Sequence, residues 1–174
     1  MKPTTTRCEG PRAAEAAVEQ GGGEFVSTIE ASVTIGRPID IVFSFFADPR
    51  NETRWVEGCE ASEKLTSGPI GVGTRFRQRG PRGDVEVEVT EFVPGKRWSF
   101  RVIDDTAPFV TVGTQRFEGD DRGTRVTWSY DAAPKGTLAR IAAPMLRIMA
   151  SRRHGSQLLL ARDLLEQRSI RPPA

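Results

Sequence analysis

Apolar residues recur at every second position in several stretches of the chain, a period that predicts β-strands. In FVSTIEASVTI the alternating positions are Ile29, Ala31, Val33 and Ile35. After Trp55 the same alternation returns in quick succession, in stretches such as TRFRQR, DVEVEVTEF and RGTRVTWSY that are separated by turns rich in Gly and Pro. The pattern therefore predicts one strand at the start of the domain and six further strands in quick succession.

The turns suggest how these strands pair. The first hairpin turns at GPRG, the second at Pro94-Gly95, where Val89 faces Phe100, and the third at DDRG. In the first hairpin opposite charges would form a ladder on one face of the sheet, with apolar side chains on the other. The cross-strand pairs are Arg79 with Asp84, Arg77 with Glu86 and Arg75 with Glu88.

Helical segments lie on both sides of this strand-rich region. Pro38 suits the first turn of a helix in RPIDIVFSFFAD, and Asp48 can cap a second short piece from Pro49 to Trp55. From Lys135 to about residue 168 the apolar period changes to 3.6, which predicts a long helix that covers the apolar face of the sheet. Its expected stripe is Leu138, Ile141, Ala142, Met145 and Met149, drifting through Leu159, Leu160 and Leu164.

Length and composition suit one domain. The chain has 174 residues, and we expect a flexible extension over residues 1–23, a folded domain over residues 24–168 and a short tail over residues 169–174. Its net charge of +2 arises from 25 basic and 23 acidic residues that are interspersed, which favours no nucleic-acid partner. No apolar run approaches the roughly 20 residues of a membrane span, and the N-terminus lacks a secretory pattern. We therefore expect no integral membrane association and a cytoplasmic location.

Few residues could support metal or nucleophilic chemistry. His154 is the only histidine, and the helical period places it opposite the apolar stripe, at the surface. Cys8 and Cys59 form no disulfide framework, and the acidic pairs sit in turns without calcium-loop spacing. GPIGVG lacks the pattern of a phosphate-binding loop. We expect no metal and no cofactor.

Four spaced motifs carry a resemblance to a known family: IGRPIDIVFSFFADPRNETRW, SGPIGVGTRF, VTEFVPGKRWSF and RGTRVTWSY. With the order of elements, they make residues from about Phe25 to Glu166 resemble the START-like (SRPBCC) superfamily, and most closely its bacterial polyketide cyclase/dehydrase group. The resemblance implies an α+β helix-grip fold. In this fold a curved seven-stranded antiparallel sheet wraps around a long C-terminal helix, two short helices follow the first strand, and a tunnel lies between sheet and helix.

Such a tunnel would be lined by the inward positions of the strands and the helix. Trp55 either lies at the tunnel rim or packs the two short helices onto the sheet edge. The other inward side chains either bind a small ligand or simply fill the interface between sheet and helix. They are Phe76, Gln78, Val87, Val89, Trp98, Phe100, Val102, Trp128, Tyr130, Met145 and Met149.

Three polar residues are candidates for catalysis: Glu91, Tyr130 and Arg152. The register that points Val87 and Val89 inward also points Glu91 inward, where an apolar wall would raise its pKa. A bulge near the following turn would instead turn the Glu91 side chain outward. Arg152 falls on the expected apolar face of the long helix. It could hold a ligand carboxylate, pair with an acidic side chain, or reach the rim.

These observations leave three functions open. The first is a cofactor-free carrier or sensor that binds a small hydrophobic, aromatic or polycyclic molecule in the tunnel. The second is a polyketide cyclase/dehydratase-type enzyme, because ring closure needs pre-organisation and modest acid–base help more than a nucleophile. The third is a protein-interaction module whose tunnel has collapsed. The small hydrophobic ligand is the expected partner, and a homodimer is left open.

Overall fold

The structure is a computed structural model that describes residues 27–81, 83–104, 109–134 and 137–167, with the side chains of α3 described from Arg152 onward. The expected extension at residues 1–23 and tail at residues 169–174 lie outside the described residues. Within the described part, the elements follow the predicted order of one strand, two short helices, six strands and a long helix. They are β1 (Ser27–Ile35), α2 (Ile39–Phe46), η1 (Pro49–Arg54), β2 (Ala61–Lys64), β3 (Arg75–Gly80), β4 (Gly83–Val93), β5 (Arg97–Ile103), β6 (Phe109–Asp120), β7 (Gly123–Pro134) and α3 (Thr137–Gln167).

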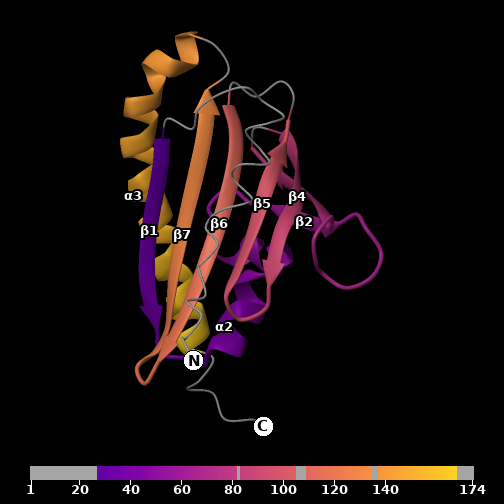
Figure 1. Cartoon of the computed structure of the whole chain (residues 1–174), viewed down its shortest axis with the longest axis vertical. Helices are drawn as coiled ribbons and strands as arrows, with labels where there is room; N and C mark the ends of the chain where they lie inside the picture. The colour runs from indigo at the N-terminus through magenta and orange to yellow at the C-terminus, as the bar shows by residue number, and fades with distance from the viewer. Residues whose placement is uncertain (1–26, 82, 105–108, 135–136, 168–174) are drawn as a thin grey trace, which may run out of the picture.

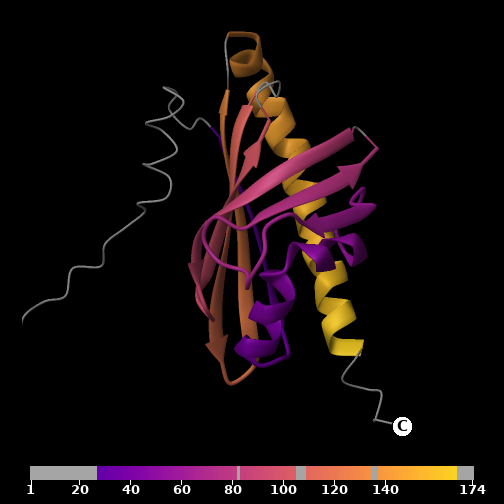
Figure 2. The same cartoon turned by 90° about the vertical axis from the view of Figure 1, so that its right-hand side faces the viewer.

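The strands form one antiparallel sheet in the order β1-β7-β6-β5-β4-β3-β2. Strands β2 to β7 make a meander in which each strand pairs with the next in sequence, and β1 pairs with β7 at the other edge. Figure 1 shows α3 running along the β1–β7 end of this sheet. Seen from the side, the sheet curves around α3, and α2, η1 and α3 all lie on its concave face (Figure 2). The expected helix-grip architecture is confirmed.

The predicted hairpin registers are confirmed. Arg79, Arg77 and Arg75 face their three acidic partners across β3 and β4, with nitrogen–oxygen distances of 3.5, 3.0 and 3.3 Å. Val89 faces Phe100, as expected from the turn at Pro94-Gly95. The third hairpin turns between Asp120 and Gly123. Charge pairing on the outer face and apolar burial on the inner face therefore favour the same register.

A bulge in β4 changes the side chains that face inward. Val89 lies opposite Phe100, but Glu91 lies opposite Ser99, so one extra residue is inserted between Val89 and Glu91. After this insertion Phe92, opposite Trp98, takes the inward position. The expectation that Glu91 faces inward is wrong.

Glu91 instead lies on the outer face of the sheet. There its carboxylate forms an ion pair with Arg97 and accepts a hydrogen bond from Ser99 Oγ at 3.2 Å. The bulge, which the sequence allowed for near this turn, therefore converts a candidate acid–base group into part of a surface network.

The short segment η1 is a 3₁₀-helix whose start is fixed by Asp48. The Asp48 carboxylate accepts a hydrogen bond from the backbone N–H of Arg50 at 3.1 Å, and Pro49 occupies the first turn, as predicted. A 3₁₀-helix has three residues per turn, so Pro49, Glu52 and Trp55 lie on one side of it. All three are buried. This spacing buries a carboxylate within a charge-rich segment.

Candidate functional site

A cavity of about 480 Å³ opens between η1, the loop that follows it, the β3–β4–β5 part of the sheet and α3. Its wall is apolar along β4 and β5, with polar groups supplied by η1, β3, β7 and α3. This composition is typical of a small-molecule pocket. The lining residues are Glu52, Val56, Glu57, Gly58, Cys59, Gln78, Arg79, Gly80, Pro81, Gly83, Val85, Val87, Phe100, Val102, Tyr130 and Arg153.

Glu52 is the most unusual group in this wall, because it is a carboxylate only 6% exposed. Its Oε2 accepts a hydrogen bond of 2.6 Å from the side-chain amide of Gln78, and no cation among the described residues pairs with it. Burial raises the pKa of Glu52 from 4.5 to about 7, and the hydrogen bond from Gln78 offsets only part of that effect. Glu52 can therefore gain or lose a proton near neutral pH.

Two further groups in the wall are influenced by Glu52. Burial, and then the negative charge of Glu52, raise the pKa of the Cys59 thiol to about 11. The same two causes raise the pKa of the Tyr130 phenol well above 10. Cys59 therefore stays a thiol rather than a nucleophilic thiolate at neutral pH, and Tyr130 stays a hydrogen-bond donor.

Tyr130 is held by aromatic contacts. Its ring centroid lies 5.8 Å from that of Phe100, 5.0 Å from that of Trp128 and 4.7 Å from that of His154. Its hydroxyl has no hydrogen-bond partner among the described residues, and the same is true of the second carboxylate oxygen of Glu52. Two polar groups of the cavity wall are thus available to a ligand.

The inward side of α3 differs from the predicted stripe. Gln157, Leu158, Ala161 and Leu165 are buried, whereas Leu159 and Leu160 are 46% and 53% exposed. The expected drift of the stripe through Leu159 and Leu160 is wrong.

This register also moves the polar residues of α3. Arg152, expected on the apolar face, is exposed to solvent. His154, expected at the surface, packs its ring against Trp128 and Tyr130, with both pairs of centroids 4.7 Å apart. Both of these placements were wrong. Polar side chains occupy part of the side of α3 that faces the sheet, so the apolar period in the sequence does not identify that side.

Arg153, which the sequence did not single out, lines the cavity from α3. Its guanidinium donates a hydrogen bond of 2.6 Å to the backbone carbonyl of Glu57, and its Nε lies 3.4 Å from the Glu57 carboxylate. These contacts connect α3 to the loop after η1. The positive charge of Arg153 is therefore already engaged by an acidic partner.

The predicted ligand-binding residues fall into two groups. Five of them line the cavity: Gln78, Val87, Phe100, Val102 and Tyr130. The others with described side chains belong to the packed core and do not line the cavity. They are Trp55, Phe76, Val89, Trp98 and Trp128. The side chains of Met145 and Met149 lie outside the described residues.

Trp55 is therefore not at a rim. It is 2% exposed, and its ring centroid lies 5.0 Å from that of Phe46 in α2 and 5.2 Å from that of Trp128 in β7. This is the packing alternative, in which the tryptophan fixes the short helices against the sheet. The neighbouring Glu52, rather than Trp55, reaches the cavity.

Sequence reasoning missed Glu52, Cys59, Arg153 and the inward position of His154. One signal could have identified Glu52, since a spacing of three from Pro49 to Trp55 puts it on the buried side of a 3₁₀ turn. No comparable signal marks Arg153 or His154, whose directions depend on how α3 is rotated against the sheet.

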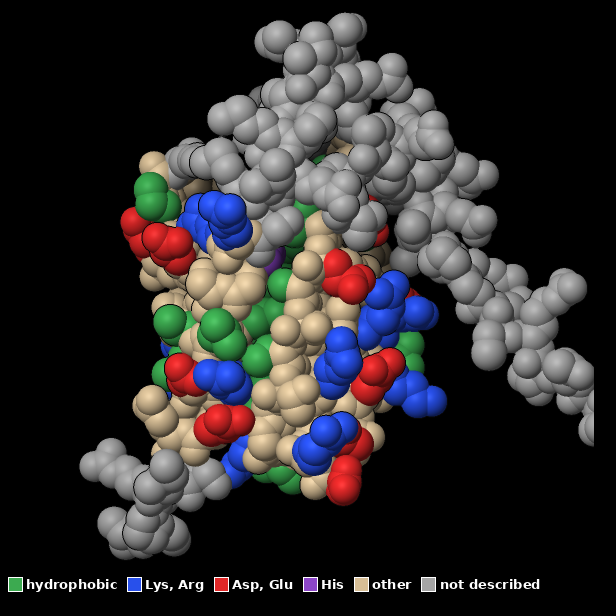
Figure 3. All heavy atoms as spheres, turned by 90° about the vertical axis from the view of Figure 1, so that its left-hand side faces the viewer, with side chains coloured by type: hydrophobic (Ala, Val, Ile, Leu, Met, Phe, Trp, Pro, Cys, Tyr) green, Lys and Arg blue, Asp and Glu red, His purple; other side chains and the backbone are tan. Residues whose placement is uncertain are grey.

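The described residues contain no group of three or more His, Cys, Asp or Glu side chains that could hold a metal ion. Nor does any described helix have the length and apolarity to cross a membrane. On the face that carries α3 and β1, acidic and basic side chains are interspersed around a central band of hydrophobic ones (Figure 3). This face thus carries no extended field of one sign.

The curved sheet, the enclosing helix and the cavity between them define a START-like helix-grip protein. The chain belongs to the family described as polyketide cyclase / dehydrase and lipid transport, which matches residues 27–164. No curated protein matches the chain.

Solved structures share the fold at low sequence identity. The di-domain ARO/CYC StfQ from the steffimycin biosynthetic pathway has a TM-score of 0.68 and 16% identity, over 87% of this chain and 54% of that chain. The Zhui aromatase/cyclase from Streptomyces sp. R1128 has a TM-score of 0.67 and 18% identity, over 82% and 94% of the two chains. The Aha1 dimer from Colwellia psychrerythraea has a TM-score of 0.62 and 16% identity, over 81% and 97%. The chain thus spans about half the length of StfQ, and at these identities the likeness concerns the fold alone.

Proposed function

We propose that the chain binds a small, mainly apolar molecule, aromatic or polycyclic, in the cavity beside Glu52 and acts as its carrier or sensor. The observation that supports this most directly is a pair of unpartnered polar groups beside the apolar wall of β4 and β5, the free oxygen of Glu52 and the hydroxyl of Tyr130. Both groups face the cavity, where a ligand hydroxyl or carbonyl could form a hydrogen bond with either of them. The ring faces of Phe100 and Tyr130 suit a planar ligand body.

The proposal is tested with 2-naphthol and its methyl ether, 2-methoxynaphthalene, by isothermal titration calorimetry on the full chain. We expect saturable binding of 2-naphthol, about fivefold weaker binding of the ether, and a similar loss in Tyr130→Phe, since one hydrogen bond contributes roughly 1 kcal/mol. Val102→Trp should block the cavity, whereas Val93→Trp, at an exposed position on the outer face, should not. Equal binding to both Val→Trp variants would place the ligand elsewhere.

A second candidate is a cyclase/dehydratase-type enzyme, and the pKa of Glu52 near 7 specifically favours it. The Glu52 carboxylate would take a proton from the carbon next to a ketone of the ligand, and the enolate would attack a second carbonyl to form the new carbon–carbon bond. The hydroxyl of Tyr130 would stabilise the developing oxyanion by hydrogen bonding, and protonated Glu52 would return its proton to that oxygen. In this arrangement Glu52 takes the role first considered for Glu91.

Enzyme and carrier can be separated by following exchange of the α-protons of acetophenone into deuterated buffer by NMR. The enzyme hypothesis predicts accelerated exchange that increases with pH through about 7 and falls at least a hundredfold in Glu52→Gln, with ketone binding retained. Binding without accelerated exchange would leave the carrier function alone. The third possibility, an interaction module with a collapsed tunnel, has less support because a cavity of about 480 Å³ is present.

A further inference from the structure

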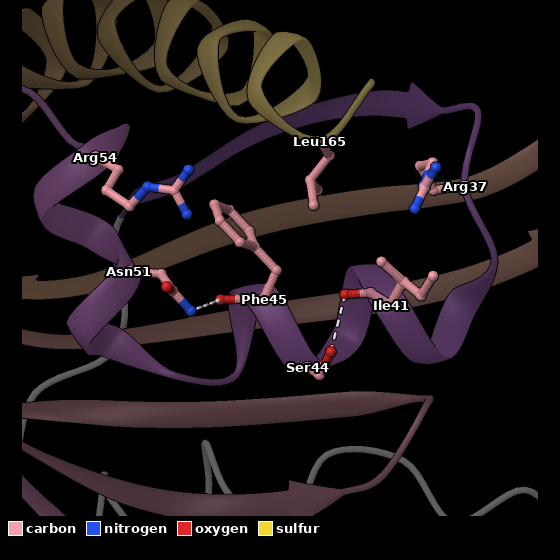
Figure 4. A pocket seen from close by; sticks show the side chains of 7 residues that line it. All are labelled: Arg37, Ile41, Ser44, Phe45, Asn51, Arg54 and Leu165. Carbon is pink, nitrogen blue, oxygen red and sulfur yellow. Dashed lines mark hydrogen bonds between the residues drawn. The ribbon is translucent and has the colours of Figure 1, made fainter. Parts of the chain in front are cut away.

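A second pocket, of about 340 Å³, lies between α2, η1 and the last turns of α3. It shares no lining residue with the cavity beside Glu52. Its wall combines an apolar surface with several polar side chains (Figure 4). The lining residues are Arg37, Ile41, Ser44, Phe45, Asn51, Arg54 and Leu165.

The apolar part of the pocket comes from two helices. Ile41 and Phe45 lie one turn apart on α2, and Leu165 approaches them from α3 (Figure 4). Ile41 remains partly exposed, although Phe45 and Leu165 are buried. The pocket therefore offers a short hydrophobic surface that is open to solvent and long enough for a small aliphatic chain.

Two guanidinium groups stand at opposite ends of this surface, Arg37 before α2 and Arg54 at the end of η1 (Figure 4). Neither forms an ion pair within the described part of the chain. The guanidinium of Arg54 lies 5.5 Å from the centre of the Phe45 ring, a cation–π contact that holds it over the pocket. Arg37 Nε is inaccessible to solvent and has no hydrogen-bond acceptor. The terminal guanidinium nitrogens of Arg37 are not closed off in this way and form no hydrogen bond within the described part of the chain, so they are the groups that a ligand oxygen could meet.

The remaining polar side chains of the pocket wall carry no charge that would neutralise the two guanidinium groups. Ser44 Oγ donates to the carbonyl of Ile41 at 3.0 Å, and Asn51 Nδ2 donates to the carbonyl of Phe45 at 2.9 Å, so both support the pocket wall. None of the described residues that line the pocket is acidic. The nearby Glu166 accepts a hydrogen bond from the backbone N–H of Gly36 at 2.9 Å and does not pair with Arg37. The pocket is thus a positively charged site with an apolar wall.

We propose that this pocket binds an amphiphilic oxyanion, a carboxylate or phosphate monoester on a short apolar stem. The oxyanion accepts a hydrogen bond from Arg37, the stem lies against Ile41, Phe45 and Leu165, and Arg54 adds a second positive charge. Charge-assisted hydrogen bonds of this kind are the strong ones, and guanidinium matches the geometry of both oxyanions. The cavity beside Glu52 contains a carboxylate and would disfavour the same ligands. The two pockets therefore select ligands of different charge.

The test is a titration of the ¹⁵N-labelled full chain with octanoate, octyl phosphate and octanol, observed through the arginine Nε–Hε NMR signals. We expect octanoate and octyl phosphate to shift the signals of Arg37 and Arg54 in a saturable way, and octanol to leave them unchanged. The relative affinity for octanoate and octyl phosphate identifies the preferred head group. This comparison needs no variant, so a folding defect cannot affect it.

Variants then locate the site. Arg37→Gln and Arg54→Gln should each weaken octanoate binding about tenfold or more, as expected for loss of a charged hydrogen-bond partner. Arg152→Gln, which makes the same change of net charge at an exposed position on α3, should have no effect. Val102→Trp, which blocks only the other cavity, should also have none. Equal shifts with octanol, unchanged affinity in both pocket variants, or loss of octanoate binding in Val102→Trp would each overturn the proposal.

Discussion

When the chain folds, the carboxylate of Glu52 loses the water that surrounds it in the unfolded state and gains one hydrogen bond from the neutral amide of Gln78. This exchange favours the protonated acid, which is why its pKa rises to about 7. In the unfolded chain the ordinary value of 4.5 applies, so between pH 4.5 and 7 the folded protein holds a proton that the unfolded chain has released. The free energy of unfolding therefore falls as the pH rises through this window, by roughly 3 kcal/mol in total.

Glu52→Gln should remove this pH dependence, because glutamine keeps an oxygen for Gln78 but carries no charge. We expect the variant to match the parent near pH 4.5 and to exceed it in unfolding free energy by roughly 3 kcal/mol at pH 8. Urea unfolding across this pH range measures the difference. Glu63→Gln, at an exposed position on β2, is the matched control and should follow the parent at every pH. If the unfolding free energy of Glu52→Gln fell with rising pH as that of the parent does, Glu52 would not be the group responsible for the pH dependence.

The sequence contains little that would identify Glu52 as a site residue. It lies in NETR, where every residue is polar, and neither the apolar period of a strand nor that of an α-helix marks its direction. Its burial depends on the 3₁₀ turn, and its pKa depends on Gln78, which is 26 positions further along the chain. Long-range contacts of this kind are set by tertiary packing, and a local pattern does not encode them.

At the scale of single elements, the hairpins were predictable because two independent forces favour one register. Opposite charges face one another on the outer face of β3 and β4, and the apolar side chains of the same strands fill the core. The bulge near Thr90 was not predictable in position, because an inserted residue leaves the alternation on each side intact. All errors about Glu91 follow from this one residue.

The direction of α3 could not be predicted for a different reason. A helix is oriented by the sum of its contacts, and this one buries Gln157 while exposing Leu159 and Leu160. An apolar stripe identifies the inward face only when polar residues avoid that face. Here the inward side includes an imidazole, an amide and an alanine, so the period in the sequence is weak.

The contact between β6 and β5 gives a prediction at the same scale. A Cβ atom added to Gly113 would lie 2.4 Å from Cζ of Phe100, whose ring covers this glycine at the cavity wall. Gly113→Ala should therefore push the ring aside and lower the unfolding free energy by roughly 1–3 kcal/mol. Gly119→Ala in the same strand is the control, because its added Cβ would meet Ile39 at an ordinary 3.6 Å. Urea denaturation measures the unfolding free energy of both variants. An equal loss in Gly113→Ala and Gly119→Ala would contradict the close packing of Phe100 on Gly113.

At the scale of the whole molecule, the cavity is closed by elements that are distant in sequence. The sheet forms one wall, η1 and its following loop form another, and α3 contributes Arg153. Figure 2 shows η1 and α3 on the concave side of the sheet. Arg153 connects α3 to this loop through Glu57, 96 positions away. Because Arg153 is half exposed, this contact should contribute little to stability, although it joins two of the elements that line the cavity.

Arg153→Ala should therefore change kinetics more than stability. We expect ligand association and dissociation to accelerate together, with Kd changed less than either rate and the unfolding free energy lowered by less than about 1 kcal/mol. Stopped-flow mixing with 2-naphthol measures the rates. Arg162→Ala, which removes an arginine paired with Asp163 on the same helix, is the control. Rates that do not differ from the control would exclude a gating role for Arg153.

The close contact between Trp55 and Trp128 has a spectroscopic consequence. Their indole centroids are 5.2 Å apart and their planes are inclined by 65°. Two chromophores so placed absorb as a coupled pair, so their electronic transitions split and give a couplet of opposite signs in circular dichroism. One indole follows η1 and the other belongs to β7, so the couplet reports how the short helix is seated on the sheet. It would provide a label-free signal for opening of this side of the molecule.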